Sequence, residues 1–123
     1  MTIWEILIYS AFLLLIFNFV KKTIAGRKIK NYDAGDAKIK IKDNSVIMLD
    51  VRTVSERKSG FIKGSIHIPL NQLSSRIDEL KKFQNKELIC YCRSGNRSLS
   101  AAVKLNKKGF NASNLRGGFI GWN

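Results

Sequence analysis

The sequence is poor in the residues that build metal centres and disulfide frameworks. Its 123 residues include one histidine, two cysteines and one proline. This is too few ligands for the usual four-ligand zinc site, and two cysteines do not make the framework of a small disulfide-rich domain. No internal repeat and no low-complexity segment is present. We therefore expect one packed domain with an appendage, no metal and no organic cofactor.

Acidic residues are also scarce. The chain has 22 Lys and Arg against 9 Asp and Glu, a formal net charge of +13, which first suggests nucleic acid or an anionic membrane surface as a partner. The one dense basic group follows the first apolar run and consists of Lys21, Lys22, Arg27, Lys28 and Lys30. Orientation of a membrane helix and headgroup contact explain this group. Since no nucleic-acid motif accompanies it, we expect no nucleic-acid partner.

The first apolar run, Ile3–Val20, has the length and composition of a membrane span. Its one charged residue is Glu5, near the start. As a helix it would extend roughly 27 Å, close to the ~30 Å hydrocarbon core of a bilayer. A buried core helix is disfavoured because the run is apolar all round, and a cleaved signal peptide is disfavoured because no positive charge precedes the run.

The flanking basic residues all lie after the span, and this predicts its orientation. By the positive-inside rule, the rest of the chain is expected in the cytoplasm as part of a single-pass membrane protein. That compartment is reducing, so Cys90 and Cys92 are expected as free thiols. The expected organisation is a transmembrane helix over residues 1–22, a basic linker over 23–32 and a globular domain over 33–123.

Short apolar runs alternate with segments of helical spacing in that domain. Strands are expected at Ser45–Val51, Glu87–Tyr91 and the start of Asn114–Trp122, and an alternating apolar segment at Phe61–Ile68 stops at Pro69. Helices are expected at Asp33–Ile41, capped by Asp33, at Leu73–Phe83, and at Ser98–Lys108, which Gly109 would end. This alternation predicts an α/β fold with an open, mostly parallel sheet flanked by helices.

The segment from Cys92 to Ser98 lies where such sheets bind ligands, at the carboxyl end of a strand and before a helix. Its members are Cys92, Arg93, Ser94, Gly95, Asn96, Arg97 and Ser98. Gly95 and Asn96 tolerate unusual dihedral angles, so successive backbone N–H groups can turn inward. These groups, the helix N-terminus, Arg93 and Arg97 are expected to lower the pKa of Cys92 and to bind an anion above its sulfur.

Nucleophilic transfer through a covalent Cys92 intermediate is the chemistry that this setting predicts. The intermediate is either a persulfide, formed from a sulfane-sulfur donor, or a cysteinyl phosphate or arsenate. Phosphatases of the Cys-x5-Arg type have one more residue before the arginine, and Ser98 occupies that position here. The shorter Cys-x4-Arg loop favours the smaller terminal sulfur.

Four segments together resemble the rhodanese family of sulfurtransferases. They are CRSGNRS (Cys92–Ser98), MLDVRTVSE (Met48–Glu56), GFIKGSIHIPL (Gly60–Leu70) and LRGGFIGWN (Leu115–Asn123), and the resemblance covers residues 33–123. It departs from the family at Phe61 and Lys63, where histidine and proline are usual.

This resemblance implies a rhodanese-like parallel sheet and a ping-pong reaction. Cys92 would take sulfane sulfur from a donor such as thiosulfate and pass it to a thiol or cyanide, or to a protein acceptor. Arg97 matches the loop arginine of the family, and Arg93 suits an anionic donor. A Cys-dependent phosphatase or arsenate reductase, and a non-catalytic sulfur-relay or docking domain at the membrane, remain as alternatives.

Other polar residues are interpreted as structural. Cys90, two residues before Cys92, is expected in the core rather than as a resolving thiol. Asp50 and Arg52 are expected to tie loops together at a strand end, and His67 to be a half-buried strand residue rather than a general base. Phe119 and Trp122 are expected to pack against the core.

Overall fold

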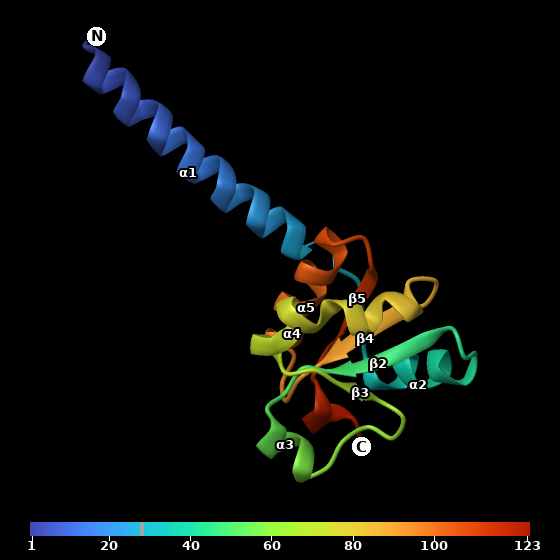
Figure 1. The fold of residues 1–123 in the computed structure, drawn as a ribbon. Coiled ribbons are helices and arrows are strands. Elements are labelled where there is room, and N and C mark those ends of the chain that lie inside the picture. Colours follow the sequence, from blue (N-terminus) through green and yellow to red (C-terminus); the bar gives the residue numbers. More distant parts are fainter. Residues whose placement is uncertain (28) are drawn as a thin grey trace.

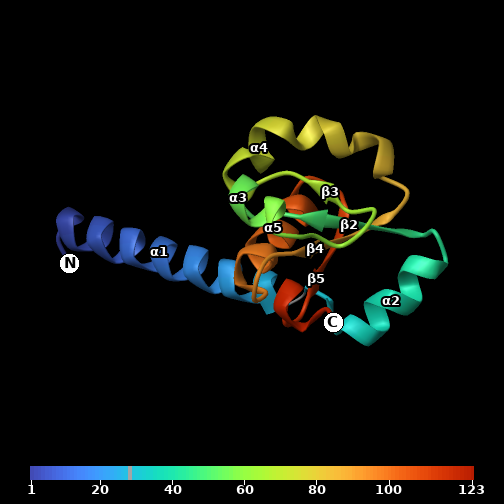
Figure 2. The ribbon, with the colours of Figure 1, turned by 90° about the horizontal axis from the view of Figure 1, so that it is seen from below.

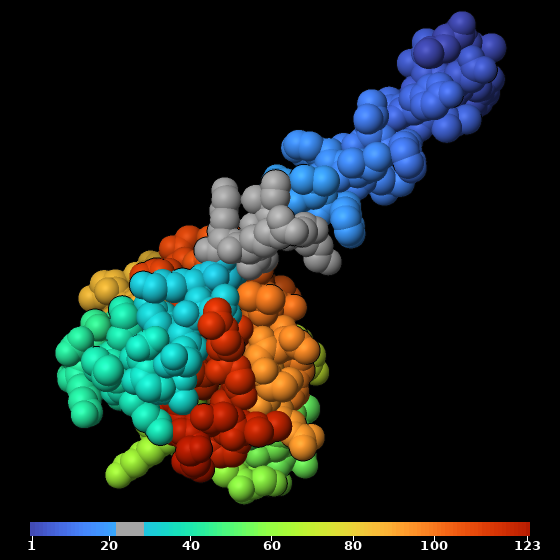
Figure 3. Space-filling view, turned by 180° about the vertical axis from the view of Figure 1, so that it is seen from behind, coloured from blue at the N-terminus to red at the C-terminus, as the bar shows by residue number. Residues whose placement is uncertain are grey.

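The computed structural model describes residues 1–27 and 29–123, with the side chains of 1–21 and 29–123. Helix α1 (Ile3–Arg27) projects away from an α/β globule (Figures 1 and 3). Its Ile3–Lys21 stretch is long and apolar enough to cross a membrane and is 0% buried, although a signal sequence near an N-terminus has the same properties. The helix continues past residue 22. Lys28 and the side chains of Lys22 and Arg27 lie outside the described part.

The globule is built on one five-stranded sheet. The strands are β1 (Asn31–Tyr32), β2 (Val46–Asp50), β3 (Ile66–His67), β4 (Glu87–Tyr91) and β5 (Asn111–Leu115), in the order β1-β5-β4-β2-β3. Every pairing between neighbours is parallel. The predicted parallel α/β sheet is therefore confirmed, and the carboxyl ends of all five strands meet at one edge.

Helices cover both faces of the sheet because its central strand, β4, is apolar on both sides. Leu88 and Cys90 pack into one apolar cluster, with residues of α4 (Leu73–Arg76), the 3₁₀ helix Ile77–Phe83 and α5 (Asn96–Lys107). Ile89 and Tyr91 point to the opposite cluster, which includes Ala37 of α2 (Ala34–Lys42). Figure 2 shows α4 and α2 on opposite sides of the strands.

The predicted elements agree best where the pattern is strongest. Strand β4 has the predicted bounds, and Asp33 caps α2 by accepting a hydrogen bond from the Asp36 N–H at 2.8 Å. Gly109 follows the α5 C-cap with φ 90°, as expected of the residue that ends a helix.

Four predicted segments need correction. The Leu73–Phe83 helix is α4 followed by a 3₁₀ turn, in which Ile77 and Leu80, three residues apart, both face the core. The Phe61–Ile68 segment forms only the two-residue strand β3. Helix α5 begins at Asn96 rather than Ser98, and β5 begins at Asn111 rather than Asn114.

Helix α3 (Val54–Lys58) was not expected from the sequence. A capping box begins it: Thr53 Oγ1 accepts from the Glu56 N–H, and Glu56 Oε1 accepts from the Thr53 N–H, both at 3.2 Å. The Thr-x-x-Glu spacing is a recognised helix-start signal and could have revealed this helix. It places Glu56 at the carboxyl edge of the sheet.

Asp50, fully buried at the end of β2, organises the loops at this edge. Its carboxylate accepts hydrogen bonds from the Arg52 N–H and side chain at 2.8–2.9 Å and from Tyr91 OH at 3.1 Å. Arg57 lies 3.3 Å from the same carboxylate. Burial opposes ionisation, but the hydrogen bonds from Arg52 outweigh it and lower the pKa of Asp50. The structural role expected of Asp50 and Arg52 is confirmed.

Replacing Asp50 tests how much this network supports the fold. Asp50→Ala leaves two buried or half-buried guanidinium groups without their carboxylate, so we expect the free energy of unfolding to fall by about 3–5 kcal/mol. Urea unfolding of the full chain in detergent, followed by tryptophan fluorescence, measures it. Asp78→Ala, which removes an exposed pair with Lys81, is the control and should change little. Equal effects of the two substitutions would contradict the assignment.

Candidate active site

Cys92 is the first residue after β4 and is 1% exposed. Its Sγ accepts a hydrogen bond from the Gly95 N–H at 3.1 Å, and the Ser98 hydroxyl lies 3.4 Å away. Gly95 has φ 114°, a conformation that suits glycine and that turns the loop back over the sulfur before α5 begins. The inward-facing N–H predicted for Gly95 is therefore present.

Hydrogen bonds stabilise the thiolate form of Cys92. Burial raises the pKa of Cys92, but the Ser98 hydroxyl and the N–H groups of Ser98, Gly95 and Ser94 outweigh it, so the pKa lies below its ordinary value. The sequence indicated the right direction but emphasised the arginines. The main groups that lower the pKa are a hydroxyl and backbone amides, which the residue pattern shows less clearly.

Arg97 faces a carboxylate rather than standing free beside the sulfur. Its Nη1 and Nη2 donate to the two carboxylate oxygens of Glu56 at 2.6 and 2.8 Å. Through these bonds Arg97 lowers the pKa of Glu56 to about 2. The guanidinium still acts electrostatically on Cys92, and its contact with Glu56 offsets part of its charge. The sequence alone placed Glu56 at the end of the Met48–Glu56 motif and did not predict its ion pair with Arg97.

The other predicted loop residues differ in exposure. Arg93, Ser94 and Asn96 are exposed, and Arg93 makes no ion pair within the described part of the chain. Ser98 is fully buried in the first turn of α5, where its hydroxyl also lies 2.6 Å from Asn114 Oδ1. Arg93 is thus the exposed cation nearest in sequence to the thiol.

A glycine turn after β5 supports the loop from behind. The Phe119 N–H donates to the Cys92 carbonyl at 2.8 Å, and the Ile120 N–H donates to the Arg93 carbonyl at 3.2 Å. A Cβ on Gly118 would lie 2.5 Å from the Arg93 oxygen, so only glycine fits there without a shift. This contact explains why the Leu115–Asn123 motif accompanies the cysteine loop.

The remaining candidate residues make structural contacts. Cys90 is a free, fully buried thiol, and burial raises its pKa to about 12. His67 Nε2 lies 2.7 Å from the Arg52 carbonyl, and Phe61 lies beneath the Arg57 guanidinium, 3.7 Å from the ring centroid. Among the described residues, no group of His, Cys, Asp and Glu could hold a metal ion.

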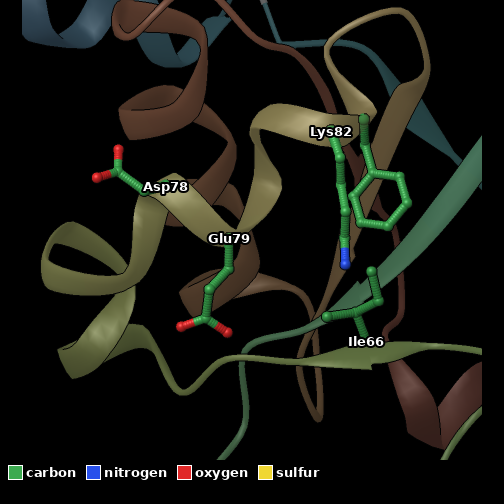
Figure 4. A pocket seen from close by; sticks show the side chains of 5 residues that line it. Ile66, Asp78, Glu79 and Lys82 are labelled. Atoms are coloured by element: carbon green, nitrogen blue, oxygen red, sulfur yellow. The ribbon is translucent and has the colours of Figure 1, made fainter.

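Two surface pockets help to define the site's surroundings. One, of about 410 Å³, opens beside the loop and is lined by Val51, Thr53, Pro69, Leu70, Asn71, Arg97 and Lys104. Another, of about 330 Å³, is lined by Ile66, Asp78, Glu79, Lys82 and Phe83. In Figure 4, Lys82 extends toward Ile66 while Asp78 points away. The first pocket includes Arg97 of the Cys92–Ser98 segment, the second includes no residue of that segment, and Cys92 itself lines neither.

Known proteins are similar to this chain in sequence and in fold. Residues 33–123 match the family model for the rhodanese-like domain. A sulfurtransferase of Allochromatium vinosum is 36% identical over 78 residues, 63% of this chain and 71% of that protein. The crystal structure of a rhodanese-related protein from Thermoplasma volcanium superposes with a TM-score of 0.70 at 32% identity, covering 76% of this chain and 89% of that one.

A tRNA uridine(34) hydroxylase of Buchnera aphidicola is also similar, at 30% identity over 92 residues, 71% of this chain but only 30% of that protein. The domain thus occurs within larger proteins of another named activity. The match over residues 33–123, with the parallel sheet and the cysteine loop described above, shows that this chain belongs to the rhodanese-like family.

Proposed function

We propose that the protein is a sulfurtransferase that carries sulfane sulfur as a persulfide on Cys92. One observation carries the proposal: the Cys92 sulfur accepts a hydrogen bond from Gly95 N–H at 3.1 Å and faces the Ser98 hydroxyl. These hydrogen bonds lower the pKa of Cys92 and so favour the thiolate over the thiol, without a histidine base. The same setting also suits the terminal sulfur of a persulfide, which carries negative charge.

Sulfur transfer then has two steps. The Cys92 thiolate attacks the outer sulfur of a donor such as thiosulfate, a new S–S bond forms, and sulfite leaves with the electron pair of the old one. An acceptor thiolate or cyanide next attacks the outer sulfur of the persulfide, and the Cys92 thiolate is released. Arg93, exposed at the loop, attracts the anionic donor, while the loop amides stabilise the bound sulfur.

Two alternatives use the same loop. A phosphatase or arsenate reductase would need a larger cradle for a tetrahedral oxyanion, and here the loop arginine is one position closer to the cysteine and is paired with Glu56. A sulfur carrier would form the persulfide but deliver it only to a specific protein. The pocket beside Arg97 and Lys104 offers an anionic acceptor a place to bind.

Intact-mass measurement after incubation with thiosulfate tests the persulfide. We expect the full chain in detergent to gain one sulfur atom and to lose it on addition of cyanide. Cys92→Ser should abolish the gain, and Cys90→Ala, which alters a buried thiol of the same strand, should retain it. A gain without release to cyanide would favour the carrier. No gain, with hydrolysis of an aryl phosphate instead, would overturn the proposal.

The Glu56–Arg97 pair is expected to hold the loop in its reactive shape. Arg97→Lys and Glu56→Gln each remove a two-bond pair, so we expect persulfide formation to slow by about tenfold. Stopped-flow measurement of sulfite release gives the rate. Glu79→Gln, which breaks an exposed pair with Arg76, is the matched control. Unchanged rates of sulfite release in both Arg97→Lys and Glu56→Gln would show that the pair is dispensable.

The Glu56–Arg97 ion pair contributes to stability over a defined pH range. The pKa of Glu56 is lowered from 4.5 to about 2, so its contribution to stability is complete above pH 4.5 and is lost as the pH falls toward 2. The wild-type rate should therefore show no titration step of Glu56 near pH 4.5.

We further propose that α1 anchors the domain to a membrane, with the globule in the cytoplasm. The apolar Ile3–Lys21 stretch and the basic residues after it support this placement. Protease added to inside-out membrane vesicles should digest the globule, while right-side-out vesicles should protect it. Recovery of a soluble chain that lacks the first 20 or so residues would instead indicate a cleaved signal sequence.

A further inference from the structure

The Ser98 hydroxyl faces two acceptors but has one proton. Its oxygen lies 2.6 Å from Asn114 Oδ1 and 3.4 Å from Cys92 Sγ. A hydroxyl donates one hydrogen bond at a time. Since the distance to Asn114 is much the shorter, we assign the proton to the bond with the amide oxygen, which leaves a lone pair of the hydroxyl facing the sulfur. This is the arrangement that suits a Cys92 thiol, whose own proton can then be donated to Ser98.

The chain of hydrogen bonds continues to the edge of the sheet. Asn114 Nδ2 donates to Asn31 Oδ1 at 2.9 Å, and these two residues are direct partners in the β1–β5 pairing. Ser98 is fully buried and Asn114 is 5% exposed, whereas Asn31 is exposed. The three side chains therefore link the buried sulfur to the surface with all donors pointing the same way.

Ionisation of Cys92 conflicts with this direction of the hydrogen bonds, in which Ser98 donates to Asn114 and Asn114 donates to Asn31. A thiolate accepts only, so Ser98 must turn its proton to the sulfur to stabilise the charge. The hydroxyl lone pair would then face Asn114 Oδ1 across 2.6 Å, which is repulsive. Rotation of the Asn114 amide by half a turn removes the repulsion, because its Nδ2 then donates to Ser98. Asn31 can follow, since it is exposed and water can replace the bond that its Nδ2 makes to the Ile29 carbonyl.

We infer that Asn114 is a positioning residue for the Cys92 sulfur, and that its side-chain amide reverses direction when Cys92 changes from thiol to thiolate. The inference rests on the proposed role of Cys92 as the reacting thiol. The reversed chain supports the thiolate cooperatively, since each donor polarises the next. Asn114 directly precedes the Leu115–Asn123 motif, and the sequence alone assigned it no role.

The other ionisable groups that act on the sulfur keep their charge in this range. Cys90, from the same strand, stays neutral because burial raises its pKa to about 12. Arg97, from α5, stays protonated, and the pKa of its partner Glu56 is about 2. A thiol that titrates between the pKa of Glu56 and the pKa of Cys90 is therefore Cys92.

The pKa of Cys92 in asparagine variants tests the inference. It is measured as the pH dependence of iodoacetamide alkylation in the full chain, with the Cys92 peptide identified by mass. Alkylation needs no sulfur donor, so its outcome is separate from that of the sulfur-transfer assay. We expect Asn114→Ala to raise the pKa of Cys92 by about one unit, which slows alkylation about tenfold at a pH below both values.

Two further variants separate positioning from structure. In a Ser98→Ala background, Asn114→Ala should have no additional effect on the pKa, because its influence passes through the hydroxyl. Asn106 is the control: its side-chain amide also makes two hydrogen bonds, at 2.9 and 3.0 Å, but to the backbone of Ala112. Asn106→Ala should lower stability and leave the pKa of Cys92 unchanged.

Opposite results would overturn the inference. If Asn114 only competes for the Ser98 proton, its removal frees the hydroxyl for the sulfur and the pKa of Cys92 falls. NMR supplies a test without substitution: the Asn114 side-chain NH₂ signals should titrate with the same midpoint as Cys92, while those of Asn106 should not. Flat Asn114 signals through the Cys92 titration would show that the amide does not reverse.

Discussion

The protein depends on a single tight turn, in which four residues connect the central strand to a helix and surround one sulfur atom. Between β4 and α5 lie Cys92, Arg93, Ser94 and Gly95. A connection this short restricts how its backbone amides can be arranged around the sulfur. Gly95 allows the arrangement seen because glycine adopts a positive φ without strain. The parallel sheet supplies the position, because β4 is central and its carboxyl end opens at the shared edge.

The charged side chains around this turn contact groups of opposite charge. The Asp50 carboxylate contacts two guanidinium groups, those of Arg52 and Arg57, and Glu56 pairs with Arg97. Such pairs orient backbone and loops more than they attract ligands, because opposite charges in contact leave little net field. In the proposed mechanism the anionic donor is attracted by Arg93, which makes no ion pair with the described residues, and by the loop amides. Although the chain is basic, the groups that lower the pKa of Cys92 at the proposed site are mainly neutral dipoles.

The sequence predicted the sheet, the strand β4 and the position of Cys92, because buried parallel strands give continuous apolar runs and a reactive loop follows such a run directly. Two-residue strands such as β1 and β3 have no periodicity to detect. The partner of Arg97 was missed because Glu56 is 41 residues away along the chain. The role of Asn114 was not visible either, since only the β1–β5 register places it between Ser98 and Asn31.

The short connection between α1 and the sheet restricts where the loop can operate. Helix α1 ends at Arg27 and β1 begins at Asn31, and even a fully extended chain spans only about 14 Å over that interval. With α1 in a bilayer, as proposed, the domain would sample a thin layer above the lipid surface rather than a hemisphere of the cytoplasm. Its effective concentration toward membrane-bound partners would then be high, and encounters with partners free in solution would gain nothing.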